Sequence, residues 1–200
     1  MSRARVELAA CAIALVLSAC TPESRDAAVR DKLPDRFGIG RAATPAEIAA
    51  SDVDVGPDGA GLPAGSGTPE QGAPVFLTNC ATCHGNDGEG KPPLYPQIIG
   101  GPRGSFDFAS DAKIPRTIGN YWPYATTVFD YVRRAMPLTA PRSLTNDQYY
   151  AVTAYLLQRE GIIQPGTVID AKSLPAVRMP ARSHFVVDDR AGTTGGKTVR

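Results

Sequence analysis

The chain has 200 residues, of which 42% are hydrophobic and 20% are charged, so we expect one modest domain with additional segments. The formal net charge is only +1, which disfavours nucleic acid as a partner and provides no strong electrostatic steering. The 20 glycines and 18 prolines are many for this length, so loops and extended segments should make up much of the chain.

The first 19 residues predict a bacterial secretion signal. Arg3 and Arg5 form a basic region, and residues 8–19 form an apolar run that is shorter than the roughly 20 residues of a membrane span. Residues 17–20 read LSAC, which resembles the lipobox of bacterial lipoproteins. The resemblance implies cleavage before Cys20 and a lipid anchor on its sulfur, on the periplasmic side of a bacterial membrane. The alternative is an ordinary cleavage site followed by an incidental cysteine.

Two segments flank the part of the chain that is expected to form the core. Residues 20–66 have no sustained apolar period and predict a tether and extended arm, in which Thr44 and Pro45 could open one short helix. Residues 163–200 are polar and contain proline, and predict an extended C-terminal tail with a disordered Gly/Thr/Lys end. The core domain is therefore expected at residues 67–162.

Two of the three helices expected in this core have a capping box. Thr68 and Gln71 predict a helix that runs toward Cys80, although Pro74 in its interior predicts a late start or a bend. Thr145 and Gln148 predict the last helix, which should end before the glycine at position 161.

The remaining helix is indicated by its apolar spacing. It is expected to open at Pro123 and to bury residues at i, i+3, i+4 and i+7, namely Ala125, Val128, Phe129 and Val132. No alternating pattern of useful length separates the three helices, so the fold class is all-α.

Residues 80–84 read CATCH, the C-x-x-C-H pattern of covalent haem attachment. Cys80 and Cys83 can reach the two vinyl groups on one porphyrin edge, and the adjacent His84 can ligate the iron. A zinc site would need two further ligands, but the mature chain has no other unmodified cysteine and only His184 as a second histidine. A thioredoxin-like pair would need a βαβ context, which is not predicted. The motif therefore predicts one covalently bound haem c.

The second axial ligand of the iron is expected to be Met136. The following Pro137 restricts Met136 to an extended conformation and keeps it out of a helix. This arrangement resembles class I cytochromes c, whose ligand methionine lies in a loop before the last helix. Met179, His184 and an open position are the alternatives. Ligation by His and Met raises the reduction potential, which favours electron transfer over catalysis.

Further residues around the haem can be proposed from the same resemblance. His84 should donate its other ring N–H to a backbone carbonyl, for which Pro93 has suitable spacing and Pro92 is the alternative. Arg133 and Arg134 either contact an acidic partner or face water. The candidate donors to the haem propionates are Trp122, Tyr121, Tyr124 and Arg103, with core packing as the alternative for the aromatic residues.

A longer resemblance covers roughly residues 36–182. The segments FGIGR (37–41), TPAEI (44–48), IGNYWPYATTVFDY (118–131), RRAMP (133–137) and LPAVRMP (174–180) resemble the cytochrome subunit of the sulfur-oxidising (Sox) sulfane dehydrogenase and related sulfite dehydrogenase cytochromes. The resemblance implies a class I cytochrome c fold with an N-terminal arm and a C-terminal tail. It also implies a molybdenum-cofactor dehydrogenase subunit as electron donor, and a downstream cytochrome or oxidase as acceptor.

Two other functions stay open at this point. A general periplasmic electron shuttle, to a terminal oxidase or from an unrelated dehydrogenase, would use the same haem. Thiosulfate or peroxidase chemistry at the haem would require an open or easily displaced sixth position. The chain is expected to act as an electron-transfer subunit of an oxidoreductase complex, without being an enzyme by itself.

Overall fold

The structure is a computed structural model that describes residues 37–101, 106, 111 and 113–186. Four predicted features lie outside the described residues: the signal peptide, the proposed lipidation of Cys20, the propionate candidate Arg103 and the end of the C-terminal tail. The chain forms two compact units, Met1–Pro45 and Ala46–Arg200, and the candidate site lies in the second. Within the described residues, no helix has the length and apolar character needed to cross a membrane.

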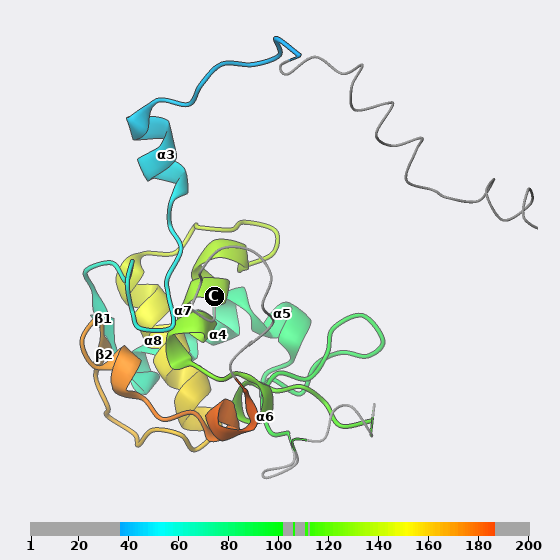
Figure 1. The fold of residues 1–200 in the computed structure, drawn as a ribbon. Helices are drawn as coiled ribbons and strands as arrows, with labels where there is room; N and C mark the ends of the chain where they lie inside the picture. Colours follow the sequence, from blue (N-terminus) through cyan, green and yellow to red (C-terminus); the bar gives the residue numbers. More distant parts are fainter. Residues whose placement is uncertain (1–36, 102–105, 107–110, 112, 187–200) are drawn as a thin grey trace, which may run out of the picture. The chain divides into compact units, whose positions relative to one another are not determined.

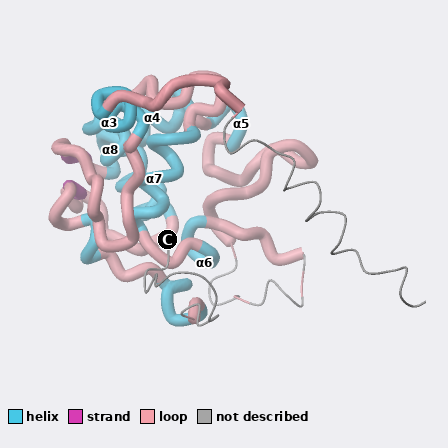
Figure 2. Tube along the Cα trace, turned by 45° about the horizontal axis from the view of Figure 1, so that its top comes forward, coloured by secondary structure: helices cyan, strands magenta, loops and turns pink. Residues whose placement is uncertain are grey.

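The second unit is built from helices joined by long loops (Figure 1; Figure 2). The short helix α3 (Pro45–Ser51) has no buried residue. The remaining elements follow in the order β1 (Ser66–Gly67), α4 (Pro69–Asn79), α5 (Ala81–His84), α6 (Ile118–Tyr121), α7 (Ala125–Ala135), α8 (Asn146–Arg159), β2 (Ile169–Asp170) and the 3-10 helices η1 (Leu174–Ala176) and η2 (Pro180–His184). The described elements are helices apart from two short strands, in agreement with the predicted all-α fold class.

Helices α4 and α8 form the central packing of the unit. Both begin as predicted, with Thr68 and Thr145 as N-caps that form capping boxes with Gln71 and Gln148. Residues 149–157 of α8 are all buried. The two helices approach closely at Gly72, because a Cβ atom there would clash with the backbone carbonyl of Ala151. This position therefore requires glycine for packing.

Pro74 does not delay the start of α4, contrary to the prediction of a late start. The helix begins at Pro69, where the missing N–H of proline would have no intrahelical partner in any case. Pro74 removes one hydrogen bond within the helix. The capping box and the contact with α8 supply compensating stabilisation, so the helix continues to Asn79.

Helix α7 lies against α8 through aromatic contacts. Phe129 is fully buried, and its ring centroid lies 4.5 Å from that of Tyr150 and 6.4 Å from that of Tyr149. Ala125, Val128 and Phe129 are buried as the spacing predicts. The helix begins at Ala125, two residues after the expected Pro123, because Tyr124 adopts the extended N-cap conformation.

Residues 52–66, which were expected in an extended arm, pack on this helical body. Val55 is only 5% exposed, and its N–H donates to Oδ1 of Asp130 at 2.9 Å. The hydroxyl of Tyr150 donates to the carbonyl of Pro63 at 2.8 Å. Each of these bonds links the segment to a helix far along the chain, so this part of the predicted arm belongs to the folded unit.

The first part of the predicted C-terminal tail is also folded. Strand β2 pairs antiparallel with β1, with Ser66 opposite Asp170 and Gly67 opposite Ile169. Beyond β2, the buried residues are Leu174, Met179 and Ala181. This part of the tail therefore packs on the core through widely spaced apolar residues and one short pair of strands.

We predict that Gly72→Ala destabilises the haem-loaded protein by about 1–3 kcal/mol, because the added methyl group overpacks the α4–α8 contact. The intrinsic helix propensity of alanine acts in the opposite direction by about 1 kcal/mol. The measurement is the free energy of unfolding in denaturant, with Thr78→Ala at an exposed position of α4 as the matched control. Equal or greater stability of Gly72→Ala would contradict the close approach.

Candidate functional site

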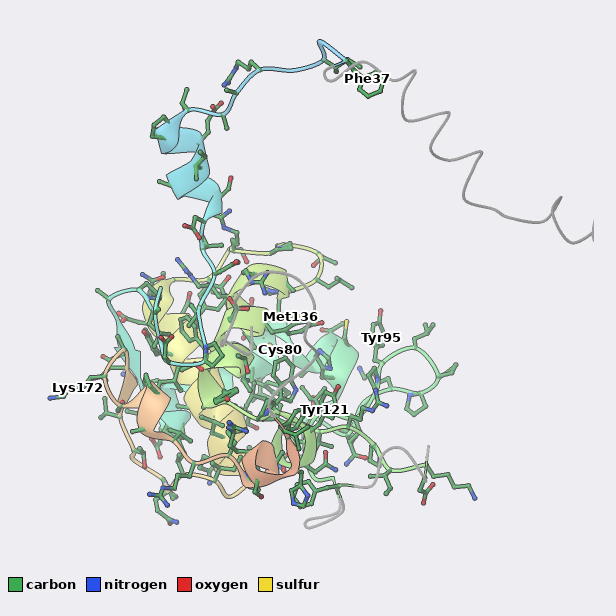
Figure 3. The ribbon with its side chains drawn as sticks, viewed as in Figure 1. Phe37, Cys80, Tyr95, Tyr121, Met136 and Lys172 are labelled. Atoms are coloured by element: carbon green, nitrogen blue, oxygen red, sulfur yellow. The ribbon has the colours of Figure 1, made fainter. Side chains whose placement is uncertain are left out.

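The second unit contains a cavity of about 440 Å³. Its walls come from α4, α5, α6, α7 and α8 and from the loops that follow α5 and α7. The lining is mostly apolar, and α8 contributes Val152 and Leu156 to it. Four of the five predicted haem-binding residues line this cavity, namely Cys80, Cys83, His84 and Met136. Figure 3 shows Cys80 and Met136 near each other in the middle of the unit.

The local backbone explains how the motif residues reach the cavity. Helix α4 ends at Cys80, whose φ and ψ are −121° and −37°, and the single turn of α5 follows directly. The N–H groups of Cys83 and His84 both donate to the carbonyl of Cys80, at 3.1 and 2.9 Å. Gly85 then ends the turn with a φ of +79°, a conformation that glycine adopts without strain.

Met136 lies at the C-terminal end of α7, outside the helix. Its φ and ψ are −122° and 146°, which is the extended conformation expected before Pro137. Its N–H still donates to the carbonyl of Val132 at 3.0 Å, so the last turn of α7 holds the residue in place. The chain therefore presents a thioether to the same cavity that receives the imidazole of His84.

The two alternative ligands lie elsewhere. Met179 is buried in the core and is not among the residues that line the cavity. His184 is exposed, and its ring stacks on Phe106 with a centroid separation of 3.7 Å. Within the described residues, no group of three or more His, Cys, Asp and Glu side chains could hold a metal ion.

The family of the chain follows from comparisons with known proteins. The Cytochrome c family model matches residues 69–160. A chain of the sulfane dehydrogenase SoxCD from Paracoccus pantotrophus is 42% identical, with a TM-score of 0.66 over 78% of this chain and 74% of that one. The chain belongs to the cytochrome c family. A thiosulfate dehydrogenase (TsdBA) chain from Marichromatium purpuratum is 24% identical, with a TM-score of 0.34 over 45% of this chain and 18% of that one. A search of curated proteins found no match.

The residues present suit the covalently bound haem c of this cytochrome family. Two thiols, one imidazole and one thioether face a mostly apolar cavity, which is the donor set of a His/Met haem site. When bound, the haem supplies one-electron redox chemistry.

Burial sets the protonation states of the attachment residues. It raises the pKa of the Cys80 thiol to about 11, with a smaller contribution from the nearby Cys83, so Cys80 is a protonated thiol at neutral pH before attachment. Burial also lowers the pKa of His84, which favours the neutral imidazole that can ligate a metal. Tyr95, whose pKa is raised chiefly by a hydrogen bond with Cys83, lies beside the second thiol.

The predicted hydrogen bond from His84 to the carbonyl of Pro93 is not present. Nδ1 of His84 has no hydrogen-bond partner among the described groups. Pro93 is exposed and does not line the cavity. The reason is a backbone bridge between Lys91 and Tyr95, with N···O distances of 2.8 and 3.1 Å, which makes residues 92–94 a surface turn. Pro96, just beyond this turn, lines the cavity instead.

The aromatic candidates for contact with the haem divide into two groups. Tyr121 and Trp122 line the cavity as predicted, and Trp122 packs edge-on against Tyr131 at 5.6 Å. Tyr124 does not line it, and its ring instead lies 4.9 Å below the guanidinium of Arg182. Sequence reasoning missed Arg116, another lining residue, because no motif marks the loop that carries it.

Arg133 and Arg134 bond within the unit, and Arg134 also faces water, with 46% of its side chain exposed. Arg134 forms a bidentate ion pair with Asp130, with Nε at 2.9 and 3.0 Å from the two carboxylate oxygens. Arg133 donates to the carbonyl of Val53 at 3.2 Å. Because Asp130 also accepts from the N–H of Val55, these side chains link residues 53–55 to the helix that precedes Met136.

We predict that Met136→His keeps the haem attached, because Cys80 and Cys83 are unchanged, but lowers the reduction potential, because a second imidazole stabilises ferric iron more than a thioether does. The oxidised variant should also lose the charge-transfer band between methionine sulfur and ferric iron. Potentiometric titration and absorption spectroscopy provide the two measurements. Met179→Leu, a volume-conserving change in the core, should preserve both properties. An unchanged potential in Met136→His would contradict the assignment of this ligand.

Proposed function

We propose that this chain is a membrane-tethered monohaem cytochrome c that accepts electrons from a molybdenum-cofactor sulfite or sulfane dehydrogenase and passes them to the respiratory chain. The observation that carries the electron-transfer part is the cavity lined by Cys80, Cys83, His84 and Met136. Donation to a downstream cytochrome or oxidase completes the proposed path.

The ligand arrangement favours relay over chemistry on a bound substrate. His84 and Met136 line one cavity and would both hold the haem iron, which would leave no coordination position for a substrate. The remaining lining is mostly apolar, which excludes water and supports a high reduction potential. Both properties suit the acceptance and release of single electrons.

The proposed partner rests on the extent of the match with the sulfane dehydrogenase chain. That match covers 78% of this chain at 42% identity, whereas the family model covers only residues 69–160. The likeness therefore extends beyond residues 69–160, a range that is flanked by residues 52–66 and 163–181. These segments pack on the helices and carry buried residues, including Val55 and Leu174, so they are part of the folded unit that a partner would contact.

We predict that sulfite or a protein-bound sulfane reduces the haem when the chain is purified from solubilised native membranes together with a molybdenum-containing protein. The absorbance of the reduced haem follows the reaction. Sulfate is the matched anion control, because its sulfur is fully oxidised and cannot reduce the haem. A haem that dithionite reduces, with no reduction by either sulfur substrate and no associated molybdenum protein, would contradict the proposed partner. That result would favour a general electron shuttle.

The membrane tether depends on Cys20 and the preceding lipobox-like residues. We predict that the haem-containing chain fractionates with membranes and that Cys20→Ala releases it to the periplasmic fraction, because lipid attachment requires the sulfur. Thr21→Ala, at the next position, should leave the fractionation unchanged. Mass spectrometry of the mature N-terminus gives an independent readout. An unmodified Cys20 in the mature wild-type chain would contradict the anchor.

A further inference from the structure

Arg116 is the only Lys, Arg, Asp or Glu residue among the described residues that line the haem cavity. A haem carries two carboxylate groups, and a carboxylate beside an apolar wall is stabilised by an opposite charge or by hydrogen bonds. The wall offers the aromatic residues Tyr95, Tyr121, Trp122 and Tyr131 as neutral donors. Among the lining residues that the structure describes, Arg116 alone offers a positive charge.

The backbone on both sides of Arg116 is fixed by one buried side chain. Asn120, which is 2% exposed, accepts the N–H of Thr117 at 2.8 Å and donates to the carbonyl of Pro115 at 2.9 Å. Thr117 is the N-cap of α6 and is itself buried. Arg116 therefore enters the cavity wall from a constrained loop position, with the position of its Cα set by the start of α6.

Aromatic contacts position the side chain. The guanidinium carbon of Arg116 lies 5.2 Å from the centroid of the Tyr121 ring, which is within the range of a cation–π interaction. Phe185 in turn packs edge-on against Tyr121, with 6.1 Å between the two ring centroids. Arg182 donates to the carbonyl of Phe185 at 3.3 Å. The C-terminal segment after η2 thus supports the cavity wall.

We propose that Arg116 is the counter-charge for a haem carboxylate, and that Asn120, Tyr121 and Phe185 are positioning residues that hold it there. A guanidinium matches the geometry of a carboxylate through two parallel N–H donors. A fixed positive charge beside the haem favours the ferrous over the ferric state. Arg116 therefore raises the reduction potential, and the segment around Phe185 contributes to this effect through Tyr121.

The test compares reduction potentials of haem-loaded variants in which one positive charge is removed at two places. Arg116→Gln removes it at the cavity, whereas Lys172→Gln removes it between β2 and η1, away from the labelled cavity residues (Figure 3). We expect Arg116→Gln to change the ferrous/ferric equilibrium three- to tenfold, a negative shift of about 30–60 mV for a one-electron couple. Lys172→Gln should produce little shift, because the charge is distant and screened. Equal shifts in the two variants would overturn the proposal.

Two further variants distinguish the effect of losing the Arg116 charge from the effect of damaging the structure. Arg116→Lys retains the charge and should recover at least half of the shift, while the band that reports the Met136 ligand stays unchanged in all variants. Phe185→Ala leaves Arg116 in the chain but removes its support, so we expect a smaller negative shift, with Val186→Ala at a 90% exposed position as control. If Arg116→Gln cannot be loaded with haem, the reduction potential of Phe185→Ala becomes the deciding measurement. A potential equal to that of the wild-type protein would overturn the proposal.

Discussion

The close contact of α4 with α8 at Gly72 is the constraint on which the rest of the structure depends. Helix α4 leads directly into the turn that carries Cys80, Cys83 and His84, and α8 forms another wall of the same cavity. A larger side chain at position 72 would separate the two helices and move the attachment residues away from that wall. The site is therefore positioned by a backbone approach that requires glycine, more than by any polar interaction at the site.

Local sequence signals predicted two capping boxes and the extended backbone of Met136. The capping residues Thr68 and Thr145 mark helix starts through bonds to residues three positions away, and Pro137 restricts Met136 through its immediate neighbour. Such short-range effects can be read without knowing the fold. The resemblance to class I cytochromes c and to the Sox cytochrome was likewise confirmed by the family model and by the structural match.

Features that depend on distant contacts could not be predicted in the same way. Residues 163–181 look like a polar tail because their buried members, such as Ile169 and Leu174, are too widely spaced to form a period. Their pairing with Ser66 and Gly67 depends on the completed helical body. Spacing after the haem motif suggested Pro93 as the hydrogen-bond acceptor for His84. A backbone bridge between Lys91 and Tyr95, which no sequence motif predicts, instead leaves Pro93 exposed to solvent.

The account as a whole depends on an iron atom held between His84 and Met136 within the apolar cavity. A crystal structure of the haem-loaded chain, with the iron located by its anomalous scattering, tests this claim most directly. We expect thioether bonds to Cys80 and Cys83, with Nε2 of His84 and Sδ of Met136 as the two axial ligands. Iron ligated by water, Met179 or His184 in place of Met136 would contradict the account.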